Sequence, residues 1–386
     1  MKRLLTFFLI CFSFVEYTRA EDIIDYKYWD EGKLTWDDFQ DTLSLKGVPS
    51  AFNAFLRIEK TEKRDGNTRT IRPEAQACFD KRHSFADRQI QNENLLRLFQ
   101  LKYDLLEMYR RRLQTELNLG VVGIAADNRT RQYMDLYTEQ SKKAEQETEN
   151  GQNEIKLQEW EFYVTKELIE NLAPSIPRIS PRRFGYGFYL GTGASFPVGN
   201  IADYWAPAWQ INVGFDLAYA NTHLLCDFSA GTARTRQEIT VSNGQITDTW
   251  LRNGHNTYTS ISLGIGQQLV STKYFALMPY AGCIWSGYSD QAKIQEGRNE
   301  RTTLSYTNFN WTAGICFDYR FSTTISLVPS FWRGHREIFT ASIRTKLFIN
   351  REQYKNFNAI EGNMIRGCKL GFSVACLGFS RLLQIK

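Results

Sequence analysis

Six charged residues stand at polar positions of strand-like segments in the second half of the chain. Three are carboxylates and three are cations, so they can neutralise one another inside a confined space. An unpaired charge held away from water is costly, which makes a neutral ion-pair network the leading interpretation and a narrow ion path the alternative. The six residues are Asp216, Asp227, Asp318, Arg320, Arg344 and Lys346.

The histidines and cysteines lack the spacing that metal or nucleophilic chemistry requires. No two histidines stand four residues apart, so no pair can share one face of a helix. The sequence contains no G-x-S-x-G motif, no phosphate-binding loop and no cysteine with a credible histidine partner. We therefore expect no catalytic residue, no metal site and no cofactor, with the histidines at chance surface positions. They are His83, His223, His255 and His335.

The charged residues would be positioned by strands, because apolar and polar residues alternate from about residue 184 to the end. The polar face is mostly small, amide or hydroxyl rather than Lys and Glu, and aromatic residues stand at the strand ends. This pattern is typical of a transmembrane barrel with lipid outside and a polar interior, and a secreted β-sandwich is the alternative. The clearest apolar runs are Trp209, Ile211, Val213, Phe215, Leu217 and Tyr219, and Phe309, Trp311, Ala313, Ile315, Phe317 and Tyr319.

The number of strands follows from the pattern and from the usual even count of bacterial barrels. Nine segments look like strands, so we predict eight spanning strands, with ten as the fallback. Tight turns at 220–222, 271–273 and 321–322 are expected on the periplasmic side, and the long connections 198–206, 239–256 and 291–302 outside. In so small a barrel side chains fill the lumen. The segments are 184–197, 207–220, 222–238, 257–270, 274–290, 303–320, 323–332, 338–350 and 367–380.

The first half of the chain has a different composition. Residues 1–20 read as a signal peptide, and no apolar stretch is long enough for a spanning helix. Residues 21–172 read as an α+β domain with a long helical hairpin, because 86–172 contain no proline and carry an apolar stripe. The hairpin should break at 120–128, and its second helix should run over 129–172. A proline-rich linker (173–183) then leads into a barrel of residues 184–386. The net charge of +5 is too small to indicate nucleic-acid binding.

The first helix resembles the active-site helix of a family of secreted bacterial zinc proteases with an H-E-x-x-H motif. The resemblance covers residues 30–165, including the stretch Leu34 to Phe39 and the element Glu147-Thr148-Glu149-Asn150-Gly151. The positions in register on the helix are Leu95, Leu96, Gln100, Asp104, Glu107, Tyr109, Arg111 and Leu113.

The chemistry of that family is absent from the matched positions. The alignment places Leu98 and Lys102 where the family has two zinc histidines, Phe99 where it has the general base, and Asn150 where it has the third histidine. Zinc hydrolysis needs about three nitrogen or oxygen ligands and a base, and this set repels a cation. The resemblance implies a protease-like scaffold without metal or catalysis.

The second half is similar in pattern to small outer-membrane barrels of Bacteroidetes-type bacteria, which implies location but no activity. The leading hypothesis is a non-enzymatic outer-membrane barrel, in contact with lipid, whose periplasmic domain binds a periplasmic or outer-membrane protein partner. The surfaces of 129–160 and 239–256 are the first candidates for that contact. The alternatives are a narrow channel or small-ligand-binding barrel, and a periplasmic hydrolase with a metal held by Asp and Glu alone.

Overall fold

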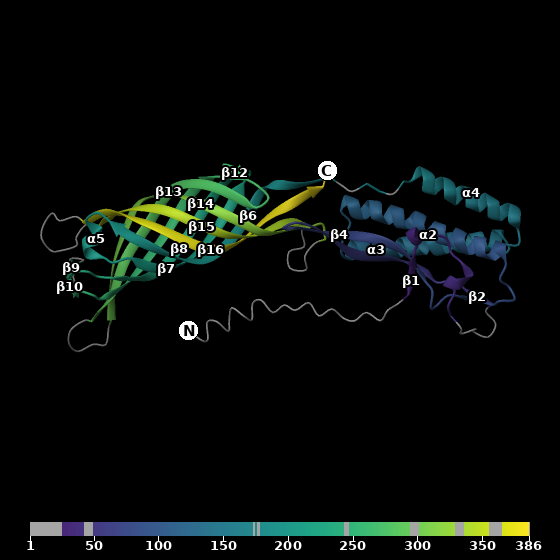
Figure 1. The fold of residues 1–386 in the computed structure, drawn as a ribbon, viewed down its shortest axis with the longest axis horizontal. Helices are drawn as coiled ribbons and strands as arrows, with labels where there is room; N and C mark the ends of the chain where they lie inside the picture. The colour runs from purple at the N-terminus through teal and green to yellow at the C-terminus, as the bar shows by residue number, and fades with distance from the viewer. Residues whose placement is uncertain are drawn as a thin grey trace. The chain divides into compact units, whose positions relative to one another are not determined.

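A computed structural model describes residues 25–41, 49–172, 174–175, 178–242, 247–293, 301–328, 336–354 and 365–385. The expected signal peptide lies outside the described residues, as do parts of the expected linker and of the loops 239–256 and 291–302. The chain forms two units, one of residues 1–59 and 74–176 and the other of 60–73 and 177–386 (Figure 1). Each unit is described by itself.

Three helices dominate the first unit: α2 (Glu93–Leu119), α3 (Ile124–Glu147) and α4 (Glu154–Glu170). The apolar stripe of α2 packs against the other two helices and against β strands of the same unit. At the start of α2, the side chain of Asn92 accepts a hydrogen bond from the backbone amide of Leu95 at 2.8 Å. None of the helices in the described part of the chain has the length and hydropathy to cross a membrane. The β and 3-10 elements are β1 (Tyr26–Tyr28), η1 (Trp29–Glu31), η2 (Trp36–Asp38), β2 (Ser50–Ala51), β3 (Ala54–Asp65), β4 (Thr68–Asp80) and β5 (Phe85–Ala86).

The prediction of one long second helix over 129–172 was wrong. Glu149, Asn150 and Gly151 all have positive φ (51°, 55° and 88°), which ends α3 and turns the chain. The amide of Asn150 donates to the carbonyl of Glu145 at 2.8 Å, and the side chain of Asn153 caps the new helix. The first break is also shorter than expected, because α3 already begins at Ile124.

The second unit is a closed barrel of eight antiparallel strands, which confirms the predicted count. Each strand pairs with the next in sequence, and the last pairs with the first, so that no edge remains between them. The strands are β6 (Ile179–Val198), β7 (Ala208–Tyr219), β8 (Thr222–Arg234), β11 (His255–Gln267), β13 (Phe275–Lys293), β14 (Arg301–Ser326), β15 (Glu337–Tyr354) and β16 (Ile365–Ile385). β6 starts inside the segment expected to be a linker.

The ninth predicted segment, 323–332, is not a spanning strand. Residues 321–322 form no turn, because β14 continues through them and keeps pairing with β15 as far as Ser326. Between Arg320 and Ser322 the register shifts by one residue, because β14 has one more residue than β15 at this point. The β-branched residues Thr323, Thr324 and Ile325 favour this continuation of the strand. The turns expected around 221 and 272 are present as hairpin connections between β7 and β8 and before β13.

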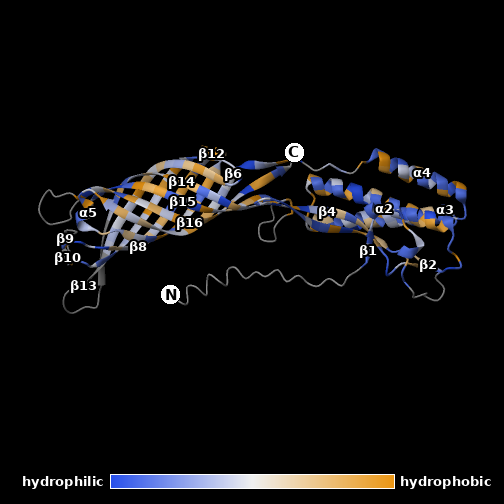
Figure 2. Ribbon diagram, in the orientation of Figure 1, coloured by the Kyte–Doolittle hydropathy of each residue, from blue (hydrophilic) through white to orange (hydrophobic). Residues whose placement is uncertain are grey.

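The predicted alternation of the barrel faces is confirmed. In β7, Trp209 and Tyr219 are 66% and 61% exposed, whereas Asn212 and Asp216 between them are buried. Figure 2 shows hydrophobic residues spread along the barrel strands. An apolar exterior, a polar lumen and complete backbone pairing are the requirements for a structure that crosses lipid with strands. The protein is therefore an outer-membrane β-barrel.

The loop end of the barrel is closed by folded connections. These contain α5 (Ile201–Tyr204) and a hairpin of β9 (Ile239–Ser242) and β10 (Thr247–Trp250), while β12 (Val270–Ser271) lies at the turn end. Ile239 and Trp250 are buried in an aromatic cluster with Trp205, Tyr288 and Tyr354. Part of the loop 239–256 is therefore buried in the barrel mouth and is not available as the partner-binding surface that the sequence analysis suggested.

The tip of the β3–β4 hairpin (residues 60–73) belongs to the barrel unit. Residues 68–71 of β4 pair in parallel with residues 323–326 of β14, beyond the point where β13 has ended. The Asn67 carbonyl accepts from the Thr323 amide at 2.8 Å, and the Asn67 side chain donates to the carbonyl of Arg320 at 3.0 Å. No feature of the sequence pattern indicated this pairing.

Candidate functional site

One ionic cluster of the lumen is centred on Arg344. Its guanidinium donates to Asp318 at 2.7 and 2.8 Å and to Asp216 at 2.7 Å, joining residues of three strands. His223 Nδ1 lies 2.7 Å from the other oxygen of Asp216. All four side chains are buried. Two carboxylates thus share one guanidinium, with an imidazole beside them.

A second ion pair occupies the middle of the lumen. Lys346 Nζ lies 2.8 and 2.7 Å from the two oxygens of Asp227. Ser262 and the Tyr189 hydroxyl also donate to this carboxylate, and the ammonium lies 4.8 Å from the centre of the Tyr280 ring. The pair is neutral and its polar atoms are largely satisfied, as a stable buried pair requires.

A third ion pair, which the sequence analysis missed, lies toward the loop end. Lys369 Nζ is 3.3 Å from Glu352 and sits over the rings of Tyr258 (3.6 Å) and Tyr288 (4.4 Å). Both charged residues are fully buried. They stand at inward positions of β16 and β15, so strand parity was the signal that could have found them.

The structure brings together five of the six predicted lumen charges. Asp216, Asp318 and Arg344 form one group, and Asp227 and Lys346 form another. Arg320 stands apart, and its guanidinium donates to the Thr272 carbonyl at 2.7 Å.

The expectation that all four histidines occupy chance surface positions was wrong for His223. It is 5% exposed and faces Asp216 inside the lumen. Its strand begins at Thr222, so His223 shares the inward parity of Leu225 and Asp227. The turn next to it in the sequence obscured this parity.

The lumen is filled with side chains through its middle. The cavity described there, between Asp227, Lys346 and Tyr280, has a volume of only about 30 Å³. Above it the aromatic cluster closes the loop end, with Trp205 stacked on Tyr288 at 4.2 Å between ring centres. This arrangement favours the neutral network over the ion path.

The α2 positions that the sequence analysis compares with a metal site are buried in the structure. Leu98 and Phe99 are 1% and 4% exposed and pack in the main core of the first unit. Lys102 is also buried, where it pairs with Glu145 and lies 4.7 Å from the centre of the Phe52 ring. Asn150 lies in the exposed turn between α3 and α4. Within the described residues no group of three or more His, Cys, Asp or Glu could hold a metal ion.

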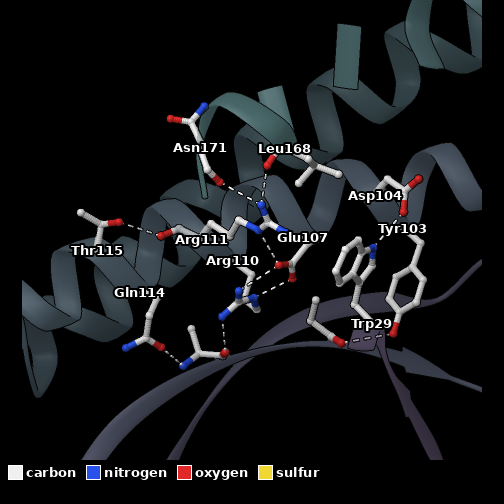
Figure 3. Close-up of polar contacts among 12 residues, drawn as sticks. Trp29, Tyr103, Asp104, Glu107, Arg110, Arg111, Gln114, Thr115, Leu168 and Asn171 are labelled. Carbon is white, nitrogen blue, oxygen red and sulfur yellow. Dashed lines mark hydrogen bonds and ion pairs between the residues drawn. The ribbon is translucent and has the colours of Figure 1, made fainter. Parts of the chain in front are cut away.

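Polar residues of α2, among them Asp104, Glu107 and Arg111, form hydrogen bonds that join α2 to its surroundings (Figure 3). Asp104 accepts from the Trp29 indole at 2.8 Å and from Gln100 at 2.7 Å. Glu107 is buried and forms ion pairs with both Arg110 and Arg111. Arg111 also donates to the carbonyls of Leu168 and Asn171 at the end of α4, at 2.6 and 2.8 Å. These contacts fasten α2 to α4 and to the first residues of the unit.

The pKa of Asp104 predicts how the stability of the helical unit varies with pH. Burial raises this pKa, while the hydrogen bonds from Trp29 and Gln100 partly oppose the shift. A carboxyl group with a raised folded pKa costs stability above that pKa, and the cost disappears as the pH falls through it. We expect Asp104→Asn to melt at a higher temperature than the wild type at pH 8.

The advantage of Asp104→Asn should shrink as the pH approaches 4. Circular dichroism at 222 nm reports mainly α2, α3 and α4, and about 1 kcal/mol corresponds to roughly 2–4 °C in a unit of this size. Asp37→Asn is the matched control, because Asp37 is exposed. An Asp104→Asn difference that is independent of pH would contradict the prediction.

Comparisons with known proteins give likenesses of the barrel only. No family model and no curated protein matches the sequence. Among solved structures, Ail of Yersinia pestis is 10% identical and has a TM-score of 0.27, with 51% of this chain and 99% of that chain covered. The N-terminal barrel of Pseudomonas aeruginosa OprF (8%, 0.23) covers 51% and 99%, and the Escherichia coli outer-membrane protease OmpT (8%, 0.23) covers 53% and 98%. At scores this low the strand pairing of the barrel itself carries the assignment.

Proposed function

We propose that the barrel anchors a periplasmic interaction domain, made of the α-rich first unit, that binds a protein partner without catalysis. The observation that carries this proposal is an apolar stripe on the outer face of α4. Ile155, Phe162 and Ile169 are 73%, 73% and 67% exposed and follow one another at intervals of seven residues. Residues seven apart lie on one side of a helix, so these three form one strip instead of scattered surface positions.

The opposite face of α4 accounts for the packing of the helix within its own unit. Leu157, Trp160 and Val164 are buried against the core of the first unit. The strip formed by Ile155, Phe162 and Ile169 is therefore not required for this packing. An exposed apolar helix face flanked by charges of both signs fits a helical or grooved protein partner.

The barrel connections support a periplasmic position for the first unit. The chain enters β6 at Ile179, which pairs with Ile385 at the barrel end that carries the tight turns. Outer-membrane barrels keep their short turns on the periplasmic side. Residues 21–172, which precede this entry, would accordingly face the periplasm.

Site-specific photo-crosslinking in intact cells tests the proposal. A photoreactive residue at Phe162 should give a discrete adduct with a protein partner, whereas the same residue at the exposed polar position Lys142 on α3 should not. Phe162→Ser should abolish capture from a neighbouring photoreactive site at Ile155 and change stability by no more than about 0.5 kcal/mol. Equal adducts at Phe162 and Lys142, or none at either Ile155 or Phe162, would overturn the proposal.

The alternative function is a metal-dependent hydrolase, and metal analysis of the purified protein distinguishes it from this proposal. The burial of Leu98 and Phe99 in the core supports the non-enzymatic function. Stoichiometric zinc in protein purified without chelators, together with loss of helical stability after chelation, would instead support the hydrolase.

A further inference from the structure

A cavity of about 410 Å³ lies at the turn end of the barrel unit. Its walls come from residues near the turns, from inward positions of β14, β15 and β16, and from Thr68 of the hairpin tip. This volume is in the range of small-molecule sites, and it is more than ten times the space in the middle of the lumen.

The charged lining of this cavity is predominantly basic. Lys273, Arg320, Arg344 and Arg381 line it, against the single carboxylate of Asp318. Two of these cations already form ion pairs: Arg344 with Asp318 and Asp216, and Lys273 with Asp65 at 3.2 Å.

Arg320 and Arg381 have no such compensation. Arg320 donates to the carbonyl of Thr272, and Arg381 donates to the carbonyls of Arg183 and Ala220. Neither has a carboxylate within ion-pair distance among the described residues. Asp318 and Asp216 attract these two guanidinium groups only from beyond ion-pair distance, so neither group is directly paired with a carboxylate among the described residues.

Two deeper lining residues have unused hydrogen-bonding capacity. Arg344 is 1% exposed and His223 is 5% exposed, and within the described parts of the chain neither Arg344 Nη1 nor His223 Nε2 has a hydrogen-bond partner. Buried polar nitrogens are normally paired, so each indicates a missing partner. Both residues line the same cavity as Arg320 and Arg381.

The remaining wall combines polar side chains, among them Asn221, Gln268 and Thr340, with an apolar part. Ile325, Ile338, Leu377 and Phe379 contribute to it, and they supply a surface on which the carbon body of a ligand could pack.

We propose that this cavity binds a small organic oxyanion, a phosphate or carboxylate on a short apolar body. The anionic group pairs with Arg320 and Arg381, because a guanidinium binds such groups through two parallel hydrogen bonds. The body of the ligand lies against Leu377 and Phe379. This site would make the barrel a binding module in addition to an anchor, and it does not depend on the proposed role of α4.

Phenyl phosphate is a suitable probe, because it combines an oxyanion with a small apolar ring. Titration calorimetry of the full chain in neutral detergent should give a Kd below about 1 mM. Inorganic phosphate should bind at least ten times more weakly, and phenol should not bind measurably. Because hydrogen bonds to charged groups are the stronger ones, Arg320→Gln and Arg381→Gln should each raise the Kd for phenyl phosphate about 10-fold or more.

Arg351→Gln is the matched control, since Arg351 is exposed on β15 and does not line the cavity. It should bind phenyl phosphate as the wild type does. Arg320→Lys serves if Arg320→Gln fails to fold, and it should weaken binding by losing the paired geometry while keeping the charge. Retention of the folded form on unheated gels is the check on folding. Absence of binding by the wild type, or equal binding by Arg351→Gln and the two cavity variants, would overturn the proposal.

Discussion

Replacing Arg344 with methionine is expected to destabilise the barrel by about 3–5 kcal/mol. The substitution removes the only cation in contact with both Asp216 and Asp318 among the described residues and leaves two buried carboxylates side by side. Urea unfolding of the full chain in lipid vesicles, followed by tryptophan fluorescence and by loss of the folded band on unheated gels, measures the effect.

Two further variants separate charge from packing at this position. Arg344→Lys should retain part of the stability, because the charge remains while the fork that spans both carboxylates is lost. Combining Arg344→Met with Asp216→Asn and Asp318→Asn should recover most of the loss, since a neutral set leaves no uncompensated charge. If Arg344→Met alone unfolds at the wild-type urea concentration, the three residues do not form the network described above.

Leu98→Ala is expected to cost the helical unit about 2–5 kcal/mol, because it opens a cavity in a packed core. Leu98 is 1% exposed in the core of the first unit, and it stands at one of the two positions that the expected protease resemblance would match to zinc histidines. A residue lining a disused, open metal cleft would be far less costly to shorten. Thermal melting of the full chain at 222 nm distinguishes these possibilities.

The control for Leu98→Ala is Leu136→Ala on α3, where the side chain is 44% exposed. This control should change the stability by no more than about 0.5 kcal/mol. Similar melting temperatures for the two variants would show that α2 does not use Leu98 as a core residue.

The barrel could be predicted because its signal is local and repeats every two residues. Once β7 was recognised as a strand, the outward positions of Trp209 and Tyr219 and the inward position of Asp216 followed from parity alone. The same rule predicts inward positions for the whole set of six charged residues, which includes Asp216, Asp318 and Arg344. Pairing within the group depends on the register between strands, which parity does not give.

The features that escaped prediction depend on backbone geometry or on contacts distant in the sequence. The turn at 149–151 needs positive φ at Glu149, Asn150 and Gly151; Asn-Gly is a turn signal, but the prediction of one long helix did not use it. The parallel pairing of residues 68–71 with β14 joins polar, β-branched segments that have no distinguishing pattern. His223 was predicted to lie at the surface because it stands next to a turn in the sequence, although its position in β8 points into the barrel.

The hairpin tip at residues 60–73 has a consequence for biogenesis. Past Tyr319 the flank of β14 no longer has β13 beside it, and β4 supplies the missing backbone partners, with Asn67 and Arg320 in contact although they are 253 residues apart. A truncation that begins after residue 73 would leave these amides and carbonyls open, as on any bare edge strand. Such a shortened product would have an open strand edge that could pair with another chain, so covering this edge requires both early and late parts of the polypeptide.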